Sequence, residues 1–154
     1  MLGLWIGGTE ELIFRGFLLN TLMDGGFKEA SAVSAEMLLK PTATLWVAAA
    51  ISSLIFAVLH LVWEVRETLP QLPGLWLMGM VLVLARLSDG GNLGLAWGLH
   101  AGWIWGLASI DAAGLIKYTG KASVWITGLG AKPLAGVAGI LCLFGTAAAV
   151  WISN

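Results

Sequence analysis

Charged side chains are scarce in this sequence. Asp, Glu, Lys and Arg make up 11% of its 154 residues, whereas a soluble domain carries about 25%. The net charge is −1 and the basic residues form no run, so we expect no nucleic-acid partner. The single cysteine, Cys142, excludes an intrachain disulfide. A small soluble domain, a nucleic-acid-binding protein and a disulfide scaffold are all poor descriptions of this chain.

Apolar residues take the place of the missing charge. They make up 58% of the chain, and the mean hydropathy is +0.88. A domain of this size has too little interior to hide so much apolar surface, so lipid is the solvent that suits it. Spanning helices need about 20 apolar residues. Five apolar stretches cover residues 2–23, 43–63, 72–87, 93–110 and 133–152. The sequence therefore predicts an all-α fold, a polytopic transmembrane bundle of about five spanning helices.

The sequence predicts one domain, residues 1–154, in which polar connections separate the apolar stretches. Residues 24–41 and 64–73 read as connections, and residues 111–132 read as an interfacial loop before an extra C-terminal span over 133–152. Asp89 to Asn92 predict a tight turn. Charged residues already occur at positions 10 and 11, and we therefore expect helices N-terminal to this chain to be missing from it.

Ionisable residues occur away from the C-terminal boundary residues in three of the apolar stretches, the first, second and fourth. Glu10, Glu11 and Arg15 lie in the first, His60 in the second and His100 in the fourth. Each such group costs a few kcal/mol at the middle of a bilayer, and it normally faces the bundle interior and serves a function. These five residues are therefore the candidate functional site.

Spacing gives the two glutamates different roles. Glu11 and Arg15 are four residues apart on one helix face, where they can form an ion pair with a mainly structural role. Glu10 points about 100° away around the helix, which leaves it as the free carboxylate. At about 1.5 Å of rise per residue, Glu10, His60 and His100 fall within roughly 10 Å of one depth. A shared site is geometrically possible.

Several chemistries suit such a set. A carboxylate and a neutral histidine can hold and deprotonate a water molecule, and a second histidine can donate to an oxyanion. Zinc bound by Glu10, His60 and His100 is the alternative, although the compact His-Glu-x-x-His spacing is absent. Two alternatives involve no hydrolysis: these residues could form the proton relay of a transporter, or they could only hydrogen-bond neighbouring helices together.

Three motifs carry a family resemblance. Glu10 to Arg15 read Glu-Glu-x-x-x-Arg, Phe56 to His60 read Phe-x-x-x-His, and His100 begins the third motif. In order and separation the sequence resembles the CPBP family, which comprises type II CAAX prenyl endopeptidases, bacterial Abi-type relatives and bacteriocin-processing or self-immunity proteins. Residues 98–106 are similar to the cyanobacterial and plastid branch.

The resemblance implies a glutamic-type intramembrane protease without a metal cofactor. By this analogy Glu10 is the general base, His60 orients the water, and His100 contributes to the oxyanion site. The implied partners are the lipid bilayer and a membrane-associated peptide or protein substrate, in a multi-pass protein of a bacterial inner or cyanobacterial membrane. The implied supporting residues are Glu11, Arg15 and Phe56, with Phe56 packed against His60.

One position departs from the family pattern. The third motif expects asparagine at position 104, where this chain has Ile104. Isoleucine donates no hydrogen bond, and the loss of one oxyanion donor costs a factor on the order of 10²–10³ in rate. The alternative function is therefore a non-catalytic membrane scaffold or immunity protein on the same fold.

Overall fold

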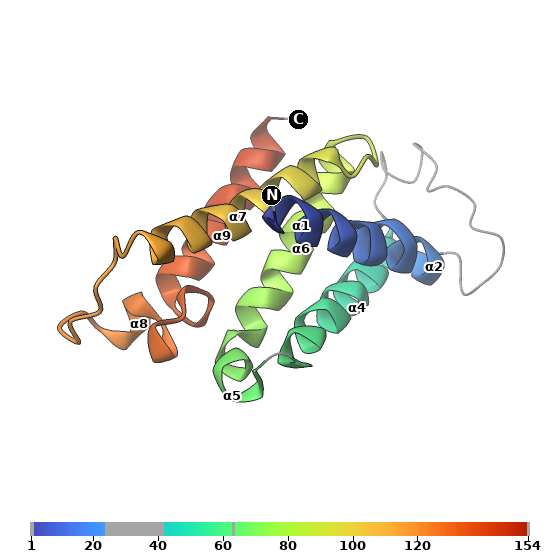
Figure 1. The fold of residues 1–154 in the computed structure, drawn as a ribbon. Coiled ribbons are helices and arrows are strands. Elements are labelled where there is room, and N and C mark those ends of the chain that lie inside the picture. The colour runs from blue at the N-terminus through green and yellow to red at the C-terminus, as the bar shows by residue number, and fades with distance from the viewer. Residues whose placement is uncertain (1, 24–41, 63, 154) are drawn as a thin grey trace.

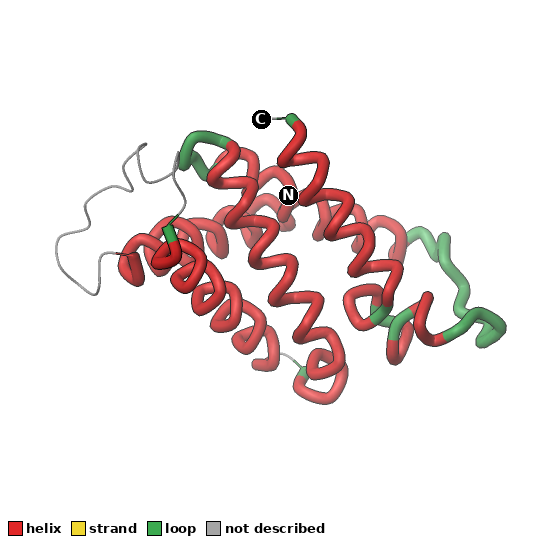
Figure 2. Tube along the Cα trace, turned by 180° about the vertical axis from the view of Figure 1, so that it is seen from behind, coloured by secondary structure: helices red, strands yellow, loops and turns green. Residues whose placement is uncertain are grey.

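The first helical run contains a change of helix type. The computed structural model describes residues 2–23, 42–62 and 64–153. Its first run comprises α1 (Leu2–Glu11), a π-helical segment η1 (Leu12–Leu18) and α2 (Leu19–Met23). The connection predicted for residues 24–41 lies outside the described residues. Within the described ranges every regular element is a helix and no strand occurs (Figures 1 and 2), so the all-α prediction is confirmed.

The second helical run changes from an α-helix to a 3₁₀ turn at His60. α4 (Ala43–Leu59) begins after Thr42, whose Oγ1 accepts a hydrogen bond from the Leu45 N–H at 3.3 Å. This contact satisfies a backbone donor that has no partner inside the helix. The run then tightens into a 3₁₀ turn, η2 (His60–Val62). His60 therefore lies where α4 stops.

The third run is longer than predicted. α5 (Val65–Thr68), η3 (Leu69–Gln71) and α6 (Leu72–Ser88) form one helix of 24 residues. The predicted connection over residues 64–73 is therefore wrong from residue 65 onward, while α6 has nearly the bounds of the predicted stretch over 72–87. Pro70 and Pro73 fall at the starts of η3 and α6, where the run changes between α and 3₁₀ geometry, and each removes one backbone N–H donor there.

The C-terminal third contains two long helices and several short ones. A turn with positive φ at Gly90 (62°) and Gly91 (89°) leads from α6 to α7 (Gly94–Ala112), as predicted. After α8 (Val124–Thr127), η4 (Leu129–Ala131) and η5 (Pro133–Ala135), α9 (Val137–Ile152) begins. It starts later than the predicted position 133 because Gly136 is extended, with φ −130° and ψ 158°.

α6 is the central helix of the bundle. It packs against α4, α7 and α9, while α1 lies along α7 (Figure 1). Leu82 and Val83 of α6 are fully buried, and so is Phe56 of α4. This arrangement brings the first helical run, α4 and α7 together around α6. These are the elements that carry the predicted site residues.

The outer surface of the bundle is apolar. Trp5, Val62, Trp125 and Trp151 are each at least 70% exposed, and a patchwork of large apolar side chains is what lipid, rather than water, accommodates. Among the described residues, two helices are long and apolar enough to cross a membrane, Ala43–Val62 and Val65–Ser88. The count of about five spans stays a prediction.

An ion pair connects α5 to the segment that precedes η5. Residues of the predicted interfacial loop, including α8, lie at the same end as α5 (Figures 1 and 2). Lys132 Nζ lies 2.5 Å from Glu67 Oε2 there. The hydrogen bond to this carboxylate raises the pKa of Lys132 above its ordinary value.

Candidate active site

The two neighbouring glutamates end α1, directly before the π segment. Glu11 and Arg15 are fully buried, and Arg15 Nη1 donates to Glu11 Oε1 at 3.0 Å. The ion pair expected from the i, i+4 spacing is therefore present. Arg15 itself lies inside the π segment, a helix type that is rare and concentrated at functional sites.

Glu11 also holds a histidine from another helix. His100 of α7 is 2% exposed, and its Nδ1 lies 2.8 Å from Glu11 Oε1. Because an ionised carboxylate only accepts hydrogen bonds, His100 must carry its proton on Nδ1. Sequence spacing did not indicate this contact. The one sequence feature related to this contact is Gly7, because small residues let helices approach closely. A Cβ added at Gly7 would lie 3.1 Å from the Ala101 nitrogen of α7.

Glu10 faces the other ring nitrogen of the same histidine. Its Oε2 lies 3.5 Å from His100 Nε2, and its side chain is 27% exposed. That separation exceeds a normal hydrogen bond, and within the described part of the chain Glu10 Oε2 has no hydrogen-bond partner. Glu11 Oε2 has none there either, but Glu11 Oε1 accepts from both Arg15 and His100. Glu10 is thus the less committed carboxylate of the two.

His60 is oriented by its own helix. Its Nδ1 lies 2.8 Å from the Phe56 carbonyl oxygen. A carbonyl only accepts, so His60 carries the proton on Nδ1, and its Nε2 has a free lone pair in the neutral ring. The histidine can therefore accept a hydrogen bond at Nε2.

Phe56 is the common wall behind these side chains. It is fully buried and lies edge-on to His60, with ring centroids 4.6 Å apart, and to His100 at 5.8 Å. The Arg15 guanidinium lies 4.4 Å from the same ring centroid, within the range of a cation–π contact. The expected packing of Phe56 against His60 is present, and the aromatic ring restricts both histidines.

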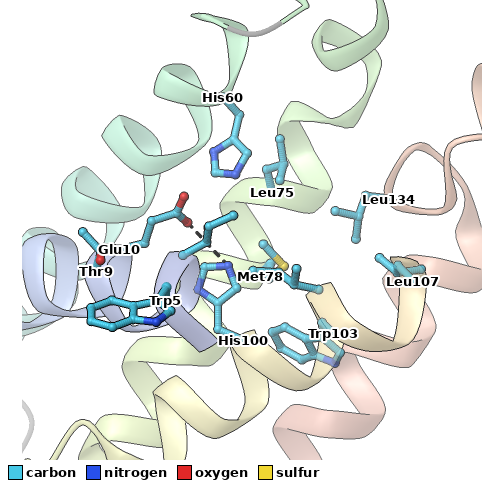
Figure 3. Close-up of a pocket in the computed structure, with 12 residues that line it drawn as sticks. Trp5, Thr9, Glu10, His60, Leu75, Met78, His100, Trp103, Leu107 and Leu134 are labelled. Carbon is cyan, nitrogen blue, oxygen red and sulfur yellow. Dashed lines mark ion pairs between the residues drawn. The ribbon is translucent and has the colours of Figure 1, made fainter. Parts of the chain in front are cut away.

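The three predicted catalytic residues line one cavity. It measures about 660 Å³, and Glu10, His60 and His100 come to it from three different helices (Figure 3). The rest of the wall is largely apolar, with contributions from Trp5, Leu75, Met78, Trp103, Leu107 and Leu134. Such a cavity, apolar with a few convergent polar groups, is the usual form of a ligand site.

Ile104 also lines this cavity. It occupies the position at which a hydrogen-bond donor was expected, and it supplies none. A Cβ added at Gly3 would lie 3.2 Å from Ile104 Cγ2, so the isoleucine packs closely against α1. Of its tryptophan neighbours, Trp103 lines the cavity, whereas Trp105 is 70% exposed.

The residues fit a metal poorly. Over residues 2–23, 42–62 and 64–153, no three His, Cys, Asp or Glu side chains form a group that could hold a metal ion. The hydrogen bonds of Nδ1 to Phe56 and Glu11 leave Nε2 of each histidine as its one available ligand atom, and such bonds are also usual for metal-bound histidines. The arrangement thus lacks the three or four converging ligands of a catalytic zinc.

Sequence reasoning also missed two supporting hydrogen bonds to the first helical run. Ser52 Oγ of α4 donates to the Phe14 carbonyl at 2.8 Å, and Trp97 Nε1 of α7 donates to the Leu4 carbonyl at 2.8 Å. Nothing in the spacing of a serine or a tryptophan within an apolar stretch indicates such contacts, because they depend on which helices become neighbours.

Comparison with known proteins identifies the family. A family model described as "Type II CAAX prenyl endopeptidase Rce1-like" matches residues 1–106. No curated protein and no solved structure matches the chain. The matched range covers more than half of the 154 residues and contains Glu10, His60 and His100. The resemblance to CAAX proteases is confirmed, and the chain belongs to the Rce1-like family of type II CAAX prenyl endopeptidases, which are membrane-embedded peptidases.

Proposed function

We propose that this chain is a multi-pass membrane protein that hydrolyses a peptide bond in a membrane-associated peptide or protein. The observation that carries the proposal is the meeting of Glu10, His60 and His100 at one largely apolar cavity. An apolar wall suits the chain of a substrate that arrives from lipid, and the polar end offers a place for one water molecule.

Glu10 is the general base of this proposal. Glu10 lines the cavity, and it forms no ion pair with an arginine in the described part of the chain. Water attacks the substrate carbonyl while Glu10 takes its proton, and the same carboxyl group then gives that proton to the leaving amine as the C–N bond breaks. His60 Nε2 accepts a hydrogen bond from the second O–H of the water and so orients the water molecule.

His100 and Glu11 form the oxyanion side. His100 can donate from Nε2 to the oxyanion when that nitrogen carries a proton, while its Nδ1–H continues to donate to Glu11. Arg15 neutralises Glu11 and prevents that carboxylate from acting as a second base. The supporting residues thus keep one histidine fixed and one glutamate free.

The test is cleavage of a membrane-associated reporter peptide by the purified protein in detergent or liposomes. Wild type is compared with Glu10→Ala, His60→Ala and His100→Ala. We expect the three variants to lose most of their turnover, because each removes a group that contacts water or substrate. Equal cleavage by all four proteins contradicts the proposal.

A second function is favoured by Ile104. The cavity has no donor at this position, and its other wall residues are largely apolar, so a non-catalytic scaffold on the same fold could bind a peptide without cleaving it. The same reporter distinguishes the two functions. Binding of the peptide without cleavage by the wild type supports the scaffold, whereas turnover that depends on Glu10 contradicts it.

A further inference from the structure

Arg86 is a buried cation without an acidic partner. It lies in α6, is 7% exposed, and forms no salt bridge with a carboxylate in the described part of the chain. Its N–H groups donate instead to backbone and amide oxygens. A charged side chain within a membrane-embedded helix is expensive, and it generally marks a functional site. The contacts of this arginine show where such a function lies.

One of these contacts is to the π segment. Arg86 Nη1 donates to the Arg15 carbonyl oxygen, and also to Asn20 Oδ1 at 3.0 Å in α2. Arg15 is the residue whose side chain neutralises Glu11. The guanidinium of α6 therefore holds the backbone of the helical run that presents both glutamates.

The other contact is to the turn before α7. Arg86 Nε donates to the Gly91 carbonyl at 2.9 Å, and the Gly91 N–H donates back to the Arg86 carbonyl at 2.9 Å. The positive φ of 89° at Gly91 is a conformation that glycine adopts readily. α7 follows this turn at Gly94 and carries His100. One side chain thus contacts the backbone leading to each partner of the Glu11–His100 hydrogen bond.

We infer that Arg86 is a positioning residue that sets the first helical run and α7 relative to each other. It acts through the 2.8 Å contact between Glu11 and His100 and does not line the cavity. A displacement of about 1 Å at a reacting group can cost about 10²-fold in rate. This role rests on the proposed peptidase function, because the geometry it maintains is that of the oxyanion side.

The experiment compares Arg86→Met and Arg86→Lys with the matched control Arg66→Met, which removes an exposed arginine of α5. We expect Arg86→Met to lower kcat by about 10²-fold with little change in KM, because the cavity wall is intact. Lysine keeps the charge and can reach one carbonyl, so we expect Arg86→Lys to retain more turnover than Arg86→Met. Arg66→Met should match the wild type.

A second measurement does not depend on turnover. The chain has two histidines, so ¹⁵N-histidine labelling gives two sets of NMR signals, and a His60→Gln variant assigns them. We expect the Nδ1–H signal of His100, held by Glu11, to shift or broaden in Arg86→Met and to stay unchanged in Arg66→Met. Tryptophan fluorescence during heating verifies that each variant is folded at the assay temperature.

The outcomes separate the two proposals. Folded Arg86→Met with wild-type kcat and an unchanged His100 signal overturns the positioning role. If Arg86→Met does not fold, Arg86→Lys decides, and a wild-type kcat together with an unchanged signal overturns the role in the same way. If the wild type itself cleaves nothing, the peptidase function fails, while the His100 signal still tests whether Arg86 fixes that residue.

Discussion

Replacing Glu10 and Glu11 one at a time by glutamine should give opposite defects, although the residues are neighbours of one type. Glu11 is fully buried and receives hydrogen bonds from Arg15 at 3.0 Å and His100 at 2.8 Å. Glu10 is 27% exposed, and its Oε2 lies 3.5 Å from His100 Nε2, too far for a normal hydrogen bond. The first is therefore part of the folded core, and the second is free for chemistry.

The expected stabilities follow from these contacts. Glu11→Gln removes the carboxylate that is bonded to the buried guanidinium of Arg15, and breaking such a buried pair costs about 3–5 kcal/mol of the free energy of unfolding. For a chain of this length, Tm falls by about 2–4 °C per kcal/mol, so a decrease of about 6–20 °C is expected. Glu10→Gln breaks no buried ion pair and should stay within about 0.5 kcal/mol of the wild type.

Glu10→Gln, the variant expected to keep its stability, should lose turnover. Loss of the general base in Glu10→Gln should lower kcat by about 10²–10⁴-fold, with the Tm unchanged. Both quantities are measured in the same micelles, with the fluorescence of the nine tryptophans following unfolding and the reporter peptide following turnover. Glu64→Gln, at an exposed carboxylate outside the cavity, is the control. A Tm decrease of equal size in both variants, or a wild-type kcat in Glu10→Gln, would refute this division.

Three further predictions concern the cavity wall and the helix contacts. Ile104→Asn supplies the missing donor and should raise kcat by up to about 10²-fold in the reporter assay; an unchanged kcat with intact folding counts against the oxyanion site. Ser52→Ala removes a buried hydrogen bond and should lower the free energy of unfolding by about 1 kcal/mol, whereas Ser53→Ala, whose Oγ has no partner in the described residues, should not lower it. Gly79→Ala places a Cβ 2.7 Å from Ser53 Cβ and should cost about 1–3 kcal/mol. Gly98→Ala, with no atom within 4 Å, is its control, and equal Tm values for the two would contradict the close packing of α4 and α6.

Local spacing predicted the parts of the site that lie within one helix. The Glu11–Arg15 ion pair follows from two residues four positions apart, and the contact of Phe56 with His60 follows in the same way. The all-α fold followed from composition, because a chain with so little charge has few other ways to satisfy its backbone in lipid. These predictions need no knowledge of which helices become neighbours.

The features that sequence did not predict depend on packing or on local exceptions. Pro70 and Pro73 indicate a break in the sequence, but in the structure they fall where the run over 65–88 changes helix type and continues. The π segment has no periodicity that distinguishes it from an α-helix. The contact between Glu11 and His100 requires α1 to lie against α7, which depends on the space left beside Gly7.

The distribution of charge inside the bundle explains how one carboxylate stays available. The helical run that carries Glu10 and Glu11 is contacted by two arginine side chains, those of Arg15 and Arg86. Two arginine–glutamate ion pairs would leave neither carboxylate available as a base. Instead Arg15 takes Glu11, and Arg86 satisfies its donors with the carbonyls of Arg15 and Gly91 and with an amide oxygen. Neither arginine pairs with Glu10, which lines the cavity.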